Sequence, residues 1–169
     1  PPIAPSAVEQ ASADGAVVVD LRSPEAFAGA FIPGSLAIPL DMLPAYAGYL
    51  LGYDHDLILV PEDREQVSVA VRYLVRMGYE RIPGYLKGGM HAWEVSGREY
   101  DRIGAVHANA LNERLKQDAD FTLLDVRKAT EFAEGRLDRA THIFLGDLQD
   151  RLAEIDKDMT NHPIGKIES

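Results

Sequence analysis

The sequence predicts an α/β fold, in which a doubly wound, mainly parallel sheet is flanked by helices and followed by an incomplete second copy. Short apolar runs alternate with segments of helical periodicity, which is typical of parallel sheets. A motif near the start recurs 105 residues later. The recurrence covers only the front of the first copy, so the second copy is expected to be partial.

The repeat is defined by identities in register. The repeated residues are Asp20, Arg22, Phe27 and Ala28, which recur as Asp125, Arg127, Phe132 and Ala133. Ile38 and Leu40 recur at the same offset as Ile143 and Leu145. We therefore expect one complete domain at residues 1–103 and roughly the N-terminal half of another at residues 104–169.

The strands of the first copy are expected to be short. They are placed at residues 17–19, 36–38, 57–60 and 81–82. Leu57–Val60 is apolar at every position, which suits a strand covered on both faces of a sheet. The proline-containing start, residues 1–5, is interpreted as an extended linker.

The expected helices of the first copy follow these strands. They cover residues 24–27, 41–51, 67–77 and a segment opened by Gly88 and Gly89. Ser23 can cap the first helix and Pro24 suits its first position. Gly78 ends the third helix as a C-cap.

The second copy begins with a helix at 108–116, a strand at 121–125 and a helix at 145–155. The counterpart of Leu57–Val60 falls near residues 162–165 and is at best a stub. A half-sheet exposes an edge and apolar faces. We expect residues 104–169 to pack against the first domain, to exchange elements with a second copy in a homodimer, or to be partly disordered.

Composition excludes several classes of function. The formal charge is −10, and both halves of the chain are acidic, so nucleic acid and anionic membrane surfaces are not expected as partners. No apolar run approaches the length of a membrane span, and the start does not resemble a signal peptide. The chain has no cysteine, which fits a cytoplasmic protein.

Several motifs together resemble the rhodanese-like domain family of sulfurtransferases. They are Asp20-x-Arg22, Glu25-x-Phe27, the segment 31–39, Gly78-Tyr79 and Gly88-Gly89-x-x-x-Trp93. The segment 47–51 and the tandem arrangement resemble the rhodanese pairs found behind metallo-β-lactamase-fold domains. In such fusions the first copy is typically degenerate and the second carries the cysteine.

The resemblance implies that sulfur transfer would require a cysteine thiolate in the loop between a strand end and a helix N-terminus. Here that loop comprises Pro61, Glu62, Asp63, Arg64, Glu65 and Gln66. Pro61 occupies the position of the family's cysteine. The three carboxylates of the loop are expected to repel an anionic sulfur donor, although acidic residues also stabilise a helix start. We interpret the loop as a degenerate active site with no catalytic residue.

The other motif residues are interpreted as structural. Asp20 with Arg22, and Asp125 with Arg127, are expected to fasten loops through charge-assisted hydrogen bonds. Gly88 and Gly89 suit a helix-opening turn next to Trp93. The five histidines lack metal-ligand spacing, so neither a metal nor another cofactor is expected.

Three hypotheses remain at this point. The chain is a non-catalytic module that docks to a protein partner or a fused metallo-hydrolase domain. Alternatively, it is a fragment of an active sulfurtransferase or persulfide-metabolising enzyme whose catalytic residues lie elsewhere. A third hypothesis makes Glu62 or Glu65 a general base, which would require an enclosed cleft and a strongly raised pKa.

Overall fold

A computed structural model of the chain describes residues 1–117, 121–155 and 165–168. The chain divides into two compact units, Pro1–Ile103 and Gly104–Ser169. Each unit is described by itself below.

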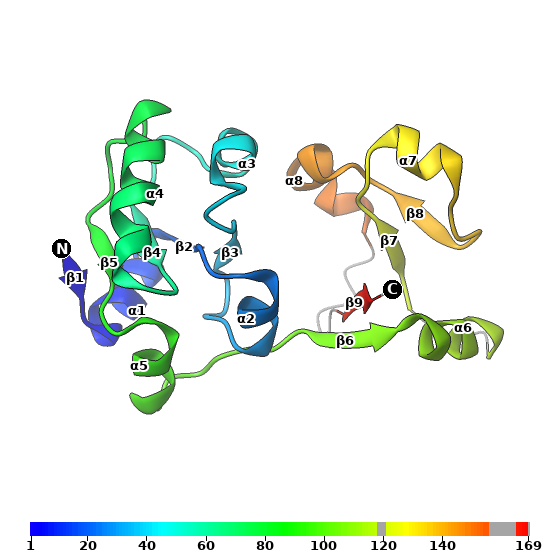
Figure 1. Ribbon diagram of the computed structural model, residues 1–169, viewed down its shortest axis with the longest axis horizontal. Coiled ribbons are helices and arrows are strands. Elements are labelled where there is room, and N and C mark those ends of the chain that lie inside the picture. Colours follow the sequence, from blue (N-terminus) through cyan, green and yellow to red (C-terminus); the bar gives the residue numbers. More distant parts are fainter. Residues whose placement is uncertain (118–120, 156–164, 169) are drawn as a thin grey trace. The chain divides into compact units, whose positions relative to one another are not determined.

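The first unit is built on a five-stranded sheet in which every neighbouring pair is parallel. The strand order is β1-β5-β4-β2-β3 (Figure 1). The strands are β1 (Pro2–Ile3), β2 (Val17–Asp20), β3 (Leu36–Ala37), β4 (Leu57–Val60) and β5 (Gly84–Leu86). β2 and β4, two neighbouring interior strands, match the expected apolar runs almost residue for residue.

Helices cover both faces of this sheet. They are α1 (Pro5–Ala13), α2 (Pro24–Gly29), α3 (Leu43–Leu50), α4 (Arg64–Arg76) and α5 (Gly89–Val95). One core cluster joins alternate residues of β2 and β4 to α3 and α4. A second cluster joins the intervening residues of the same strands to α1 and α5. The predicted α/β class, a mainly parallel sheet flanked by helices, is confirmed.

Two expectations about the sheet of the first unit are wrong. Residues 1–5 are not a linker, because Pro2–Ile3 pairs with β5 and α1 starts at Pro5. Proline is tolerated at a sheet edge, where its missing N–H faces no partner strand. The strand expected at 81–82 lies instead at Gly84–Leu86. A Cβ at Gly84 would overlap the Pro1 carbonyl oxygen, so glycine permits the close approach of β1.

The second unit contains two parallel strand pairs. β7 (Leu123–Asp125) pairs with β8 (Ala140–His142), and β6 (Gly104–His107) pairs with β9 (Gly165–Glu168). Its helices are α6 (Ala108–Lys116), α7 (Ala129–Glu134) and α8 (Leu148–Arg151).

Two expectations for the second unit concern its later part. The continuous helix expected at 145–155 is wrong, since 3₁₀ turns at Leu145–Asp147 and Leu152–Glu154 flank α8. Gly146 disfavours a regular α-helix there. Of the strand expected near 162–165, residues 162–164 lie outside the described ranges, and Gly165 begins β9. None of the helices within the described ranges is long and apolar enough to cross a membrane.

Candidate functional site

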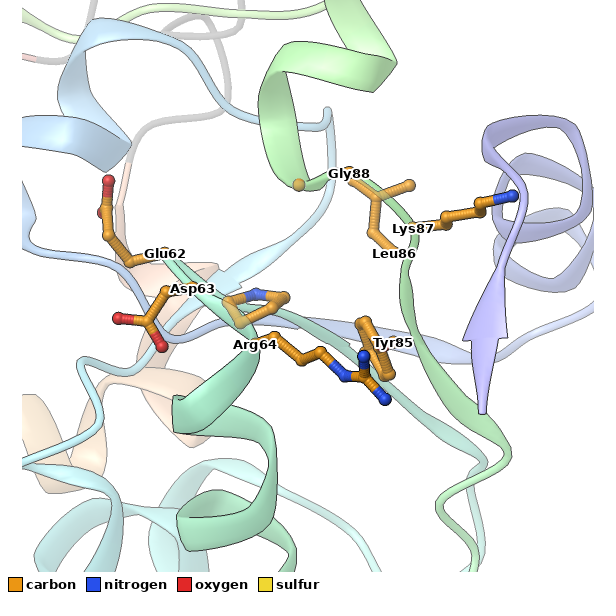
Figure 2. Close-up of a pocket in the computed structure, with 9 residues that line it drawn as sticks. Glu62, Asp63, Arg64, Tyr85, Leu86, Lys87 and Gly88 are labelled. Carbon is orange, nitrogen blue, oxygen red and sulfur yellow. The ribbon is translucent and has the colours of Figure 1, made fainter.

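The candidate site lies where β4 and β5 end. Both strands present their carboxyl ends to the same edge of the sheet, the place where α/β folds bind ligands. A hollow with a volume of about 340 Å³ opens there. It is lined by Pro61, Glu62, Asp63, Arg64, Tyr85, Leu86, Lys87, Gly88 and Gly89 (Figure 2).

Three backbone amides of the loop after β4 are bound by side chains of the loop itself. Asp63 Oδ1 accepts hydrogen bonds from the backbone N–H groups of Glu65, at 2.8 Å, and Gln66, at 3.0 Å. Gln66 Oε1 accepts one from the N–H of Glu62, at 2.9 Å. Pro61 has no N–H. Three of the donors with which this helix start could bind an anion, the N–H groups of Glu62, Glu65 and Gln66, are therefore occupied by the loop's own side chains.

Asp63 is the N-cap of α4, so the helix starts three residues before the expected Val67. Its carboxylate satisfies two of the N–H groups that a helix start leaves without partners. The arrangement stabilises the helix and also places a fixed negative charge where an anionic ligand would sit.

Not all three carboxylates of the loop, which were expected to repel an anionic donor, line the hollow. Glu65 does not line the hollow, whereas Lys87 does, so the lining carries two carboxylates and two cations. In Figure 2 the carboxylates of Glu62 and Asp63 point to one side, and the side chains of Arg64 and Lys87 point to the other. The mouth of the hollow is therefore divided in charge rather than uniformly anionic.

Gly88 and Gly89 form the turn between β5 and α5. Both have left-handed backbone conformations, with φ of +78° and +61°. A Cβ at Gly88 would approach Ala92 Cβ to 2.8 Å. These glycines allow a tight turn next to the loop after β4, as expected of a helix-opening turn.

Asp20 and Arg22 form a buried ion pair at the end of β2. Arg22 Nη2 lies 2.7 Å from Asp20 Oδ2 and donates a second hydrogen bond, also 2.7 Å, to the carbonyl of Ala30. Arg22 Nε donates to both carboxylate oxygens. The pair ties the end of β2 to the end of α2.

Asp125 and Arg127 repeat this arrangement in the second unit. Arg127 Nη2 donates to Asp125 Oδ2 and to the carbonyl of Gly135, the residue that corresponds to Ala30. The hydrogen bond from Arg127 holds the pKa of the Asp125 carboxyl below its usual range. Here the Arg127 side chain is 47% exposed, against 8% for Arg22.

Trp93 lies in the core beside α1 and Met90. Its indole N–H donates to the carbonyl of Glu99, at 2.8 Å, and the guanidinium of Arg98 lies over its ring. The side chain therefore fastens the segment after α5, a role that the sequence motif alone did not indicate.

The structure does not enclose the carboxylates that the third hypothesis names. Glu62 and Glu65 are both exposed, unlike the enclosed general base that the third hypothesis requires. Within the described ranges no group of three or more histidine or acidic residues could hold a metal ion. Tyr85, Leu86 and Lys87 were missed as lining residues because the last strand was expected three residues too early. A strand predicted at 84–86 would have placed Lys87 directly after the carboxyl end of that strand, where the hollow lies.

Comparison with known proteins agrees with this fold. The family model for the rhodanese-like domain matches residues 4–96. Thiosulfate sulfurtransferase GlpE of Stutzerimonas stutzeri is 34% identical over 79 residues, which are 47% of this chain and 71% of that protein. A sulfurtransferase of Allochromatium vinosum is 29% identical over 87 residues, which are 52% of this chain and 79% of that protein.

A third relative is matched over a shorter length. Putative sulfurtransferase YtwF of Bacillus subtilis is 38% identical over 56 residues, which are 33% of this chain and about half, 54%, of that protein.

Solved structures show the same architecture. The solution structure of the rhodanese-like domain from the Anabaena sp. protein Alr3790 has a TM-score of 0.54 and 22% identity, covering 85% of this chain and 98% of that one. Thiosulfate sulfurtransferase from Pseudomonas aeruginosa has a TM-score of 0.52 and 18% identity, covering 92% of this chain and 36% of that one. At these identities the two structures support the fold alone. The family match covers more than half of the chain's residues, and it shows that the chain belongs to the rhodanese-like domain family.

Proposed function

We propose that this chain is a catalytically inactive rhodanese-like module that serves as a docking or scaffold part of a protein handling persulfide or thiosulfate. One observation carries the proposal. The loop after β4 has no thiol, and three of its amide donors are bound by Asp63 and Gln66 instead of being open to a ligand.

The chemistry of sulfur transfer explains why this matters. A sulfane sulfur is accepted by a thiolate, which needs a lowered pKa and nearby donors to hold the negative charge. The chain has no cysteine to form that thiolate. The Asp63 carboxylate occupies the helix N-terminus that would otherwise stabilise an anion.

The proposal is tested by a thiosulfate:cyanide sulfurtransferase assay on the full chain, with thiocyanate as the readout. We expect no turnover above the buffer background, and clear turnover would refute the proposal. Pro61→Cys tests the second half of the argument. The variant should carry a thiol that reacts with an alkylating reagent, yet remain near background in the assay.

A matched variant distinguishes the missing thiol from the occupied amides. Pro61→Cys combined with Asp63→Gly and Gln66→Gly should turn over faster than Pro61→Cys alone, because the loop donors are then free. Trp93 fluorescence would verify that both variants are folded, since Trp93 is buried in this unit. Full activity in Pro61→Cys alone would show that the hydrogen bonds of Asp63 and Gln66 to the loop amides do not hinder sulfur transfer.

A second candidate function is a part of an active metallo-β-lactamase-fold and rhodanese enzyme whose catalytic residues lie outside these 169 residues. It is favoured by the Asp–Arg arrangement that the second unit repeats. The neighbouring coding sequence tests it. A cysteine-containing loop shortly after residue 169, or an upstream H-x-H-x-D-H motif, would support it, and the absence of both would count against it.

The proposal places the chain in the cytoplasm, the compartment in which sulfur-carrying thiols are kept reduced. Fractionation of cells that express the tagged chain would test this location. Recovery in a membrane or extracytoplasmic fraction would contradict it.

A further inference from the structure

The hollow at the ends of β4 and β5 holds charged side chains that do not neutralise one another. Glu62 and Asp63 supply carboxylates, and Arg64 and Lys87 supply cations. Among the residues that the structure describes, the side chains of Glu62, Arg64 and Lys87 form no ion pair or hydrogen bond. Asp63 uses only Oδ1 for its two backbone hydrogen bonds, so its Oδ2 can accept a further one. The hollow therefore offers both signs of charge to a ligand.

The backbone keeps the two signs of charge apart. Arg64 opens α4 directly after the cap Asp63, and side chains of adjacent residues at a helix start do not face each other. Lys87 comes from a different element, since it follows the end of β5. In Figure 2 the carboxylates point to one side and the cations to the other. A ligand that lies across the hollow can contact both sides at once.

The hollow is small and spans two neighbouring strands. Its volume of about 340 Å³ lies near the lower end of the roughly 300–1,000 Å³ that is typical of ligand pockets. β4 and β5 are paired, and paired strands lie about 4.8 Å apart. Pro61 and Leu86 are buried, so part of the lining is apolar. These dimensions suit a small ligand whose two charges are joined by a short carbon chain.

The charges select a ligand without net charge. A free anion would meet the carboxylates of Glu62 and Asp63, and the net charge of −10 on the chain also opposes its approach. A free cation would meet Arg64 and Lys87 instead. A molecule that carries one charge of each sign pairs with both sides, and the net charge of the chain does not repel it.

We propose that the hollow binds a small zwitterion, either a free amino acid or a short peptide with free termini. Glu62 and Asp63 accept hydrogen bonds from its ammonium group, and Arg64 and Lys87 donate hydrogen bonds to its carboxylate. The inference deepens the proposed function and rests on it, because a ligand held in a hollow without a thiol is bound rather than converted.

The test uses the isotope-labelled full chain and probes of graded length. Alanine, dialanine and trialanine carry both charges at increasing separations, and each is compared with its N-acetyl derivative and its C-terminal amide. We expect saturable changes in the amide resonances of Lys87, Gly88 and Gly89 with at least one zwitterion. That zwitterion should bind about 5-fold more tightly than either of its blocked derivatives, the effect of one exposed ion pair.

Variants assign each charge of the probe to one side of the hollow. Glu62→Gln should weaken the zwitterion about 5-fold but not its N-acetyl derivative, which has no ammonium group. Arg64→Gln combined with Lys87→Gln should weaken the zwitterion but not its amide, which has no carboxylate. Trp93 fluorescence verifies that the variants are folded.

Two controls change the charge of the same helix outside the hollow. Glu65→Gln and Arg76→Gln lie on α4 but do not line the hollow, so both should leave every affinity unchanged. Equal affinity of a zwitterion and its N-acetyl derivative would overturn the proposal, because the hollow would then be an anion site. So would the absence of saturable binding by all the zwitterions, or undiminished binding in both Glu62→Gln and the double variant.

Failure of this inference is distinguishable from failure of the proposed function. Turnover in the thiosulfate:cyanide assay would refute the proposed function, whatever the probes show. A chain without turnover that also binds no zwitterion would refute this inference alone.

Discussion

The two Asp–Arg pairs allow the effect of burial on a single interaction to be measured within one chain. Replacing Arg22 with methionine keeps the apolar stem but leaves Asp20, whose side chain is 1% exposed, without its cation. The Ala30 carbonyl also loses its donor. Breaking a buried pair in this way costs about 3–5 kcal/mol of the free energy of unfolding.

Urea denaturation followed by Trp93 fluorescence measures this cost, because Trp93 is 3% exposed and lies in the same unit. With a denaturant slope of about 2 kcal/mol per molar, the midpoint should fall by roughly 2 M. Arg127→Met is the matched control. Arg127 is 47% exposed, so solvent screens its pair; losing it should destabilise the second unit far less and leave the Trp93 midpoint unchanged. A cost below about 1 kcal/mol for Arg22→Met would refute the reasoning, because it would mean that the buried carboxylate tolerates the loss of its partner.

Three further predictions concern single groups. Asp63→Ala removes the cap of α4 and should lower the free energy of unfolding by about 1 kcal/mol in the same urea assay; no loss would show that the cap is dispensable. Burial raises the pKa of Tyr79 to about 12. The neutral phenol therefore stabilises the fold fully below pH of about 10, and this contribution is lost as the pH rises towards 12. Tyr79→Phe should flatten the alkaline fall of the urea midpoint, and an unchanged fall would contradict this. The lowered pKa of Asp125 stabilises the second unit above pH of about 4, and this is lost as the pH falls through the folded-state value. Protection of the β7 amides from exchange, measured relative to an unstructured peptide at the same pH, should fall on acidification, and less so in Asp125→Asn; identical acid profiles would exclude this role.

The central part of the fold could be predicted because burial there leaves a clear pattern. β4 is covered on both faces and is apolar throughout, so Leu57–Val60 was identified with its exact limits. Ser23 accepts a hydrogen bond from the N–H of Ala26, as expected of a cap before Pro24. These features depend on neighbouring residues or on uniform burial, and both are visible in sequence.

The sheet edge could not be predicted in the same way. β1 has only two residues, and its conformation depends on pairing with β5, more than 80 residues away. The close approach at Gly84 is likewise a tertiary contact. Such contacts leave no periodicity, so the start was interpreted as a linker and β5 was placed too early.

The location of the site followed from β4, but the hydrogen bonding within it did not. Asp63 and Gln66 are three residues apart, the spacing of an N-cap and a residue that folds back over the helix start. That spacing was a usable signal. It was missed because apolar periodicity begins at Val67 and drew the predicted start of the helix to that residue.

The hydrogen bonds of Asp63 have a consequence for any molecule that approaches the loop. A tethered carboxylate competes with free anions at an effective concentration in the millimolar range or above, since its attachment keeps it next to the amides. A small anion must exceed that local concentration, or bind much more strongly, before it displaces Asp63. The Asp63 carboxylate therefore acts as an intramolecular competitive inhibitor of anion binding to the loop. The loop's intrinsic affinity for an anion would be measurable only in a variant that lacks this carboxylate.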